Sequence, residues 1–336
     1  MKTCASKGCK EHPVALSEYC WDHLPDAALY SAELVRALNA GTDLSKSNLK
    51  KIVLKNTHIE KANLKKACLS QSDLSGNHFF DSALDEADLV GADLSDCDLT
   101  HCSLKGCDFT KADLSRARLW NVTLLDANLT EADLSGADLW NTNLHNVKLW
   151  HTSFCGTKSL SRQSFAGPSK VFDNPRVNES GAISAEESYR DLKQYFINNG
   201  MYNDASWASF KEKTMERLVF KKKGDWNYFP SMVMNILCGY GEKPYRIILT
   251  AMSTILLFAL LYFSFGAIES PGYPSYSMRW FDYIYYSTIT FTTVGYGDFV
   301  PKPFGLFRLM AAVEAFSGVF VTGLFIFTLA RKYSAR

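Results

Sequence analysis

Residues 87–99 read ADLVGADLSDCDL, and the unit A-D-L-x-x seen here extends far to either side. A Leu, Ile or Phe occupies every fifth position from Leu44 to Phe154, twenty-three positions without a slip. The residue two places earlier is mostly small, and the residue one place earlier is often Asp or Asn. A period of five fits neither the 3.6-residue period of a helix nor the two-residue period of a strand. A fixed period over so long a stretch predicts a solenoid.

Residues 42–157 resemble the pentapeptide-repeat family in this A-(D/N)-L-x-x unit. The resemblance implies a right-handed quadrilateral β-helix with four pentapeptides in each coil, the Leu and the small residue pointing inward. About six coils would make a rod about 28 Å long at the ~4.8 Å spacing of paired strands. Cys97, Cys102 and Cys107 all fall in the small inward position, which favours buried thiols over a metal site.

Residues twenty apart stack on one face of such a rod. One outward column holds Phe80, Thr100, Trp120 and Trp140. We interpret it as a docking face for a neighbouring subunit or for the chain after residue 160, with scattered surface aromatics as the simpler alternative. Acids dominate residues 73–138, which permits the DNA mimicry that some pentapeptide-repeat proteins use against topoisomerases. The net charge of +1 gives no overall attraction to nucleic acid, and no nucleic-acid partner is expected.

Residues 1–24 are a possible zinc knuckle. The candidate ligands are Cys4, Cys9, Cys20 and His23, with His12 as a replacement for one of them. Thiolates and imidazole suit tetrahedral Zn²⁺, and a metal would explain how a segment too short to bury a core is ordered. A tail with free thiols is the alternative. The nine cysteines and the polar start of the chain, without a secretory signal peptide, favour reduced thiols or metal ligands over disulfides.

Residues 25–41 are expected to form a short helix that caps the rod, with Gly41 as its stop. The apolar contacts of this helix are expected to be Leu24, Ala28, Val35 and Leu38.

Three segments follow the repeats. Residues 158–184 are rich in Ser, Gly, Pro and Asn and predict a linker. Residues 185–223 predict a helical hairpin, because two amphipathic patterns lie on either side of Asn199-Gly200. Residues 224–243 carry aromatic and apolar side chains and follow a lysine run, which favours a segment at the membrane interface.

Residues 244–336 have the pattern of a membrane module. Residues 247–267 contain no charge and would span about 31 Å as a helix, enough for the hydrocarbon core. Residues 304–330 are a second candidate span. Between them, residues 278–291 are aromatic but too short and polar to cross, which predicts a re-entrant helix.

The stretch TTVGYGD at residues 292–298 follows this re-entrant helix, and with its two spans it resembles the two-transmembrane, one-pore-loop potassium-channel family. The matching filter residues are Thr293, Val294, Gly295, Tyr296 and Gly297, flanked by Thr292 and Asp298. In such a filter rings of carbonyls replace the water around K⁺. Gly295 and Gly297 permit the left-handed angles that this needs, and Tyr296 is expected to brace the loop against the pore helix.

A second Gly-Tyr-Gly at residues 239–241 follows no span and no Thr-Val, so we interpret it as a turn. In the second span, Gly318 lies near the gating-hinge position of the resembled family, and Gly323 is its rival. Glu314 is an acid inside a span, which is functional by default or forms a structural hydrogen bond behind the filter.

The resemblance implies a homotetrameric, potassium-selective channel in the cell membrane, since one pore loop supplies one quarter of a filter. Basic flanks place both termini in the cytoplasm by the positive-inside rule. The chain shows no voltage sensor and no enzyme constellation, and names no regulatory ligand. Two alternatives stay open: a constitutive cation pore whose rods are scaffold, and a membrane-anchored interaction protein with a vestigial pore.

Overall fold

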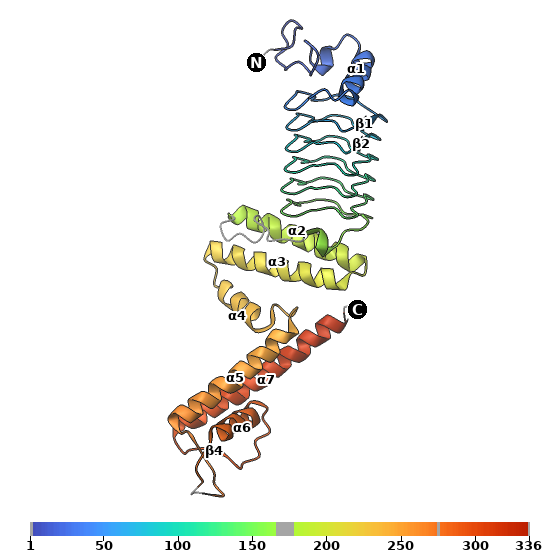
Figure 1. Ribbon diagram of the computed structural model, residues 1–336. Helices are drawn as coiled ribbons and strands as arrows, with labels where there is room; N and C mark the ends of the chain where they lie inside the picture. The colour runs from blue at the N-terminus through green and yellow to red at the C-terminus, as the bar shows by residue number, and fades with distance from the viewer. Residues whose placement is uncertain (1–2, 166–177, 274–275, 335–336) are drawn as a thin grey trace. The chain divides into compact units, whose positions relative to one another are not determined.

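The computed structural model describes residues 3–165, 178–273 and 276–334 (Figure 1). It divides into two compact units, Met1–Lys223 and Gly224–Arg336. The predicted linker covers residues 158–184, and its residues 166–177 lie outside the described residues.

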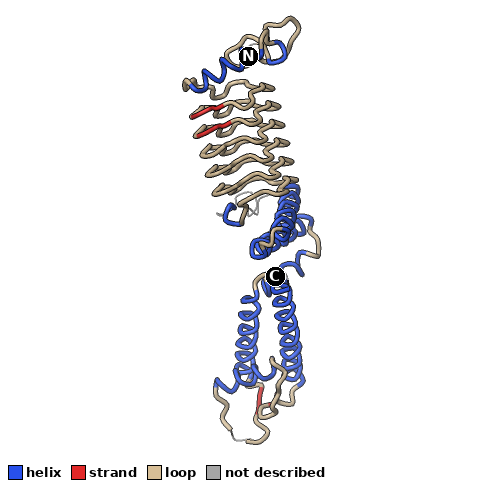
Figure 2. Tube along the Cα trace, turned by 90° about the vertical axis from the view of Figure 1, so that its right-hand side faces the viewer, coloured by secondary structure: helices blue, strands red, loops and turns tan. Residues whose placement is uncertain are grey.

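Backbone hydrogen bonds join each coil of the repeat region to the next. Parallel bridges link residues twenty apart, as in the series Asp73, Asp93 and Asp113. Two short strands, β1 (His58–Glu60) and β2 (His78–Phe80), pair with the same offset. A coil therefore holds four pentapeptides, and the coils stack into a β-helix (Figure 2). Its right-handed, four-sided form stays a prediction.

The two positions predicted to point inward fill the interior of the stack. Ala87 and Leu89, for example, are 1% and 0% exposed. Cys97, Cys102 and Cys107 are buried in the small position, and each thiol donates to a backbone carbonyl. Burial raises the pKa of each thiol to about 12. The prediction of buried core thiols is confirmed.

The short elements η1 (Trp21–His23) and α1 (Ala27–Asn39) precede the first coil. The buried face of α1 consists of Tyr30, Leu34 and Leu38. The helix is present as predicted, but Ala28 is exposed, because the buried stripe runs at four-residue spacing from Tyr30 and passes it by. Leu24 and Val35 are partly buried against the core, as expected.

Two long helices, α2 (Glu179–Asn198) and α3 (Tyr202–Lys223), lie side by side after the repeats (Figure 1). The first was predicted from residue 185 and begins six residues earlier. The cause is a cap that the composition of the segment concealed: the Asn178 side chain accepts a hydrogen bond of 2.9 Å from Gly181 N.

Helix α2 covers the last coil, together with η2 (Arg162–Phe165). Leu192 and Phe196 are buried in the same apolar cluster as the leucines of the repeats. The Tyr195 hydroxyl donates to Thr157 O at 2.8 Å. The predicted apolar face of α2 thus finds its partner in the end of the coil stack.

The second unit is mainly helical. In chain order it contains α4 (Tyr228–Cys238), α5 (Pro244–Phe265), β3 (Ile268–Glu269), α6 (Trp280–Phe291), β4 (Val300–Pro301) and α7 (Gly305–Ser334). Helices α5, α6 and α7 pack on one another. Within the described residues, α5 and α7 are long and apolar enough to cross a membrane.

Several element bounds in this unit differ from the sequence prediction: α5 begins at Pro244 rather than at residue 247, and α7 continues to Ser334 rather than ending at residue 330. The first span ends at Phe265 rather than Ala267, because Gly266 adopts φ 53° and caps the helix. The re-entrant helix begins at Trp280 rather than at residue 278, because Arg279 is its N-cap. The Arg279 backbone N–H donates to the Asp282 carboxylate at 2.7 Å, and the Arg279 carbonyl accepts from Asp282 N at 3.0 Å.

Candidate functional site

The stretch TTVGYGD follows α6 directly and adopts an alternating backbone. Positive φ occurs at Thr293 (61°), Gly295 (50°) and Gly297 (80°). The left-handed angles predicted for the two glycines are confirmed. Thr293 is an addition that the sequence did not predict, since a β-branched residue rarely adopts such an angle. The alternation turns successive peptide groups of the loop, which is the geometry a row of carbonyl ligands requires.

The side chains of this loop face away from their own chain. Val294 is 51% exposed and Tyr296 is 73% exposed. Tyr296 is thus uncovered within its own chain, and its expected bracing of the loop against the pore helix stays a prediction. At the far end of the loop, the Asp298 carboxylate lies near the Tyr285 hydroxyl. Near α6, Val294 N donates to Ile289 O at 2.9 Å.

Glu314 ties the three packed helices together behind this loop. Its carboxylate is 0% exposed. One oxygen accepts from the Tyr262 hydroxyl of α5 at 2.8 Å, and the other accepts from the Ser287 hydroxyl of α6. These contacts support the structural interpretation of the acid. Tyr262 and Ser287 were not predicted as its partners, because helix spacing does not say which residues of different helices meet.

The two glycines proposed as hinges differ in their surroundings. A Cβ added to Gly318 would lie 1.8 Å from Phe291 O, at the end of α6. A Cβ added to Gly323 would meet nothing within 4 Å. Helix α7 passes through both positions without a break. Gly318 is therefore a site of close backbone packing, as small residues are between membrane helices.

The second Gly-Tyr-Gly is a turn, as predicted. Gly239 ends α4 with φ 57°, and Tyr240 and Gly241 follow with φ 59° and 84°.

Comparison with known families decides the nature of both units. A family described as ion channel matches residues 250–335, across α5, α6 and α7. Families described as pentapeptide repeats and pentapeptide repeat region match residues 40–76 and 77–154. The chain joins a pentapeptide-repeat domain to an ion-channel domain. No curated protein matches the chain.

Solved structures similar to the pentapeptide-repeat domain include QnrB1, a plasmid-mediated fluoroquinolone resistance protein, with 21% identity over 38% of this chain and 72% of that one, TM-score 0.32. Rfr23 from the cyanobacterium Cyanothece 51142 has 26% identity over 39% and 91% of the two chains, TM-score 0.26. HetL from the cyanobacterium Nostoc sp. strain PCC 7120 has 22% identity over 38% and 91%, TM-score 0.17. With such low scores, the coil geometry rests on the hydrogen bonds described above.

One side of the pentapeptide-repeat domain carries the aromatic column. Phe80, Trp120 and Trp140 are 43%, 37% and 54% exposed. The two Trp rings meet edge to face, with centroids 6.1 Å apart. The column is thus exposed, as a docking face requires, although only the two Trp rings contact each other.

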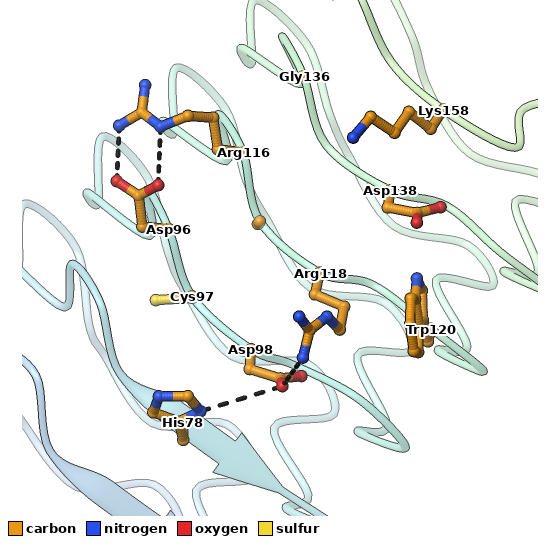
Figure 3. A pocket seen from close by; sticks show the side chains of 11 residues that line it. His78, Asp96, Cys97, Asp98, Arg116, Arg118, Trp120, Gly136, Asp138 and Lys158 are labelled. Carbon is orange, nitrogen blue, oxygen red and sulfur yellow. Dashed lines mark hydrogen bonds and ion pairs between the residues drawn. The ribbon is translucent and has the colours of Figure 1, made fainter.

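Beside this column lies an open pocket of about 360 Å³ (Figure 3). Two of its arginines pair between coils: Arg116 Nε donates to Asp96 at 2.7 Å, and Arg118 Nη1 donates to Asp98 at 2.8 Å. The Arg118 guanidinium also lies 4.9 Å from the centre of the Trp120 ring. These pairs fasten successive coils to one another.

Four potential metal ligands converge near the N-terminus, ahead of the pentapeptide repeats. Their donor atoms, from Cys4, Cys9, Cys20 and His23, all lie within 4.8 Å of one another. Cys9 Sγ is 3.8 Å from Cys20 Sγ, and Cys20 Sγ is 3.1 Å from His23 Nδ1. Tetrahedral zinc with Zn–S bonds of about 2.3 Å separates two sulfurs by about 3.8 Å, so the donor set fits that metal. His12, the alternative ligand, is not in the cluster.

Proposed function

We propose that this protein is a potassium-selective channel. The observation that carries the proposal is the loop from Thr292 to Asp298, which combines the potassium-filter sequence with left-handed angles at alternate residues. The loop follows a short helix between two helices of membrane-crossing length. Carbonyls of Thr293 to Gly297 would bind dehydrated K⁺.

We propose a homotetramer, because each chain supplies one loop and a filter needs four. The exposure of Val294 and Tyr296 supports this, since both side chains lack cover within their own chain. In the most apolar stretch of α5, and likewise of α7, only 17% is buried. Both helices therefore leave apolar surface for lipid and for neighbouring subunits.

Selectivity is tested by recording from the purified full chain in bilayers under potassium/sodium bi-ionic conditions. We expect a reversal potential far from zero and its collapse in Gly295→Ala, because Ala resists the left-handed angle by about 1–2 kcal/mol. Gly323→Ala is the matched control, since its added Cβ meets nothing. A reversal potential near zero in the unmodified protein would favour the non-selective cation pore. The absence of any current would favour the vestigial pore.

Both termini are proposed to be cytoplasmic. Basic residues precede the first span and follow the second, whereas the loop between the spans carries few basic residues. Cys155 is exposed and free, so it reports the side on which the repeats lie. An impermeant thiol reagent should label it only after cells are permeabilised, with Cys155→Ser as the blank. Labelling in intact cells contradicts this topology.

The exposed column Phe80, Trp120 and Trp140 is proposed to dock the repeats of one subunit on a neighbouring subunit and so to assemble or regulate the pore. Replacing Trp120 and Trp140 with Ala should alter open probability or tetramer stability without changing selectivity. Recording and native mass spectrometry measure the two. If neither changes, the repeats are a scaffold beside a constitutive pore.

We also propose that Cys4, Cys9, Cys20 and His23 bind one Zn²⁺. Four protein ligands and no open position are typical of a structural site, so the metal would order its segment rather than do chemistry. Elemental analysis should find about one zinc per chain in the unmodified protein and none in Cys20→Ser. Cys155→Ser should retain the metal.

A further inference from the structure

The first coil of the β-helix has an edge with no coil before it. In later coils, backbone carbonyls at this edge accept from the coil before: Leu49 N donates to Cys68 O and Leu54 N donates to Asp73 O, both at 2.8 Å. The carbonyls at the equivalent places in the first coil lie twenty residues earlier, at Asn48, Val53 and His58. An uncovered edge of this kind invites pairing with another chain.

Each of these three carbonyls has a donor from outside the repeats. Ala15 N donates to Asn48 O at 2.8 Å. Two side chains at α1 serve the others: Ser31 Oγ donates to Val53 O and Asn39 Nδ2 donates to His58 O, both at 3.0 Å. The helix thus covers two positions of the edge, and the segment that contains the metal ligands covers the third.

The segment from His12 to Ala15 is clamped onto the first coil. The Asn48 side-chain amide donates to His12 O at 3.1 Å and to Pro13 O at 3.0 Å. Val14 is 2% exposed and belongs to the apolar cluster of the repeats. The Tyr30 hydroxyl donates to Ala15 O at 2.7 Å, which joins this segment to α1.

The clamped segment lies between two pairs of metal ligands in the chain, Cys4 and Cys9 before it and Cys20 and His23 after it. Apart from η1, residues 3–23 have no regular secondary structure in the described chain. Backbone hydrogen bonds close this loop, such as Val14 N to Tyr19 O at 2.9 Å. A metal held by the four ligands would add a cross-link between its two ends and so help to fix Ala15 at the edge.

We propose that zinc binding and protection of the first coil are one event, so that the metal-loaded knuckle is the cap of the β-helix at its Asn48 face. This inference rests on the zinc proposal. Without the metal, the loop loses its cross-link, Ala15 leaves the edge, and the first coil opens more often than the coils behind it.

The test is hydrogen–deuterium exchange of the full chain in detergent, before and after zinc removal by a chelator. Amides of residues 44–54 should exchange faster by on the order of tenfold or more, while amides of residues 104–124 stay unchanged. Re-addition of Zn²⁺ should restore protection. A matched Cys155→Ser chain should respond as the unmodified protein does.

A second variant separates the cap from the metal. Asn48→Ala removes the two clamping donors and leaves the four ligands in place, so it should raise exchange in residues 44–54 with zinc still bound. A protein that carries zinc but exchanges at the same rate in residues 44–54 after chelation overturns this inference alone. A protein that binds no zinc at all overturns the zinc proposal beneath it.

Discussion

Replacing Gly318 with Ala tests whether this glycine serves close packing of α7 on α6 or acts as a hinge in α7. The added Cβ would lie 1.8 Å from Phe291 O and 2.7 Å from Phe291 C, whereas ordinary van der Waals contact begins at 3.4 Å. Helix α7 and the end of α6 must therefore separate by about 1.6 Å, because the contacted atoms belong to the backbone and cannot rotate away. Overpacking of this kind costs about 1–3 kcal/mol and occasionally more.

Gly323→Ala supplies the control within the same helix. Ala is favoured over Gly in a helix interior by about 1 kcal/mol, and the new Cβ at Gly323 has open space. We expect Gly318→Ala to lower the thermal unfolding midpoint of the detergent-solubilised channel and Gly323→Ala to leave it unchanged or raise it. Because Phe291 immediately precedes Thr292, the first variant should also impair potassium selectivity in bi-ionic recordings.

The opposite pattern would refute the packing argument. If Gly318→Ala unfolds at the midpoint of the unmodified protein and keeps its selectivity, but opens less often, then Gly318 is a hinge and its contact with Phe291 is loose. A change of open probability in Gly323→Ala alone would place the hinge there.

Three further predictions concern buried and paired side chains. Glu314→Gln should keep most of the stability of the channel domain, while Glu314→Leu leaves the Tyr262 hydroxyl without its acceptor and should cost about 1–3 kcal/mol in denaturant unfolding. Leu114→Ala in the β-helix should cost about 2–5 kcal/mol in the same measurement, and a loss below 1 kcal/mol would contradict a close-packed core. Burial opposes ionisation of Asp98, but hydrogen bonds from Thr100 and the Arg118 ion pair outweigh it and hold its pKa below the ordinary value. A lowered pKa stabilises the fold above about pH 4 and stops doing so as pH falls through the folded value, so Asp98→Asn should unfold more readily at pH 7 and match the unmodified protein in acid; parallel curves would refute this.

The sequence predicted the β-helix well because its signal is repeated. Each inward Leu reports the same environment, so one local exception does not shift the pattern. What the period could not supply was the partner of α2, since contact between Tyr195 and Thr157 joins segments of unrelated composition. The buried Glu212 of α3 was missed for the same reason: Lys193 and Arg190 of α2 pair with it at 2.6 and 3.2 Å, and only the packed helices bring them together.

In the channel domain, local backbone conformation could be predicted from the sequence, but contacts between helices could not. The turn at Gly239 and the left-handed angles at Gly295 and Gly297 follow from what glycine permits. The exposure of Tyr296 could not be predicted, because the sequence does not show whether a side chain packs on its own chain or points away from it. The contrast between Gly318 and Gly323 likewise depends on where α6 ends against α7.

The corners of the β-helix show the same limit in the repeat itself. The residue two places after each inward Leu, Ile or Phe recurrently has positive φ, as at Asp96 and Arg116 (both 56°) and Gly136 (72°). A non-glycine residue there carries a cost of about 1–2 kcal/mol, which the hydrogen bonds between coils must offset. The space available there differs between glycines: a Cβ at Gly76 would meet Asn56 Oδ1 at 2.2 Å and would need that side chain to move, but one at Gly91 would meet its nearest atom at 3.9 Å. The two glycines look alike in the sequence, and the side chain twenty residues earlier determines how much must move when another residue replaces either of them.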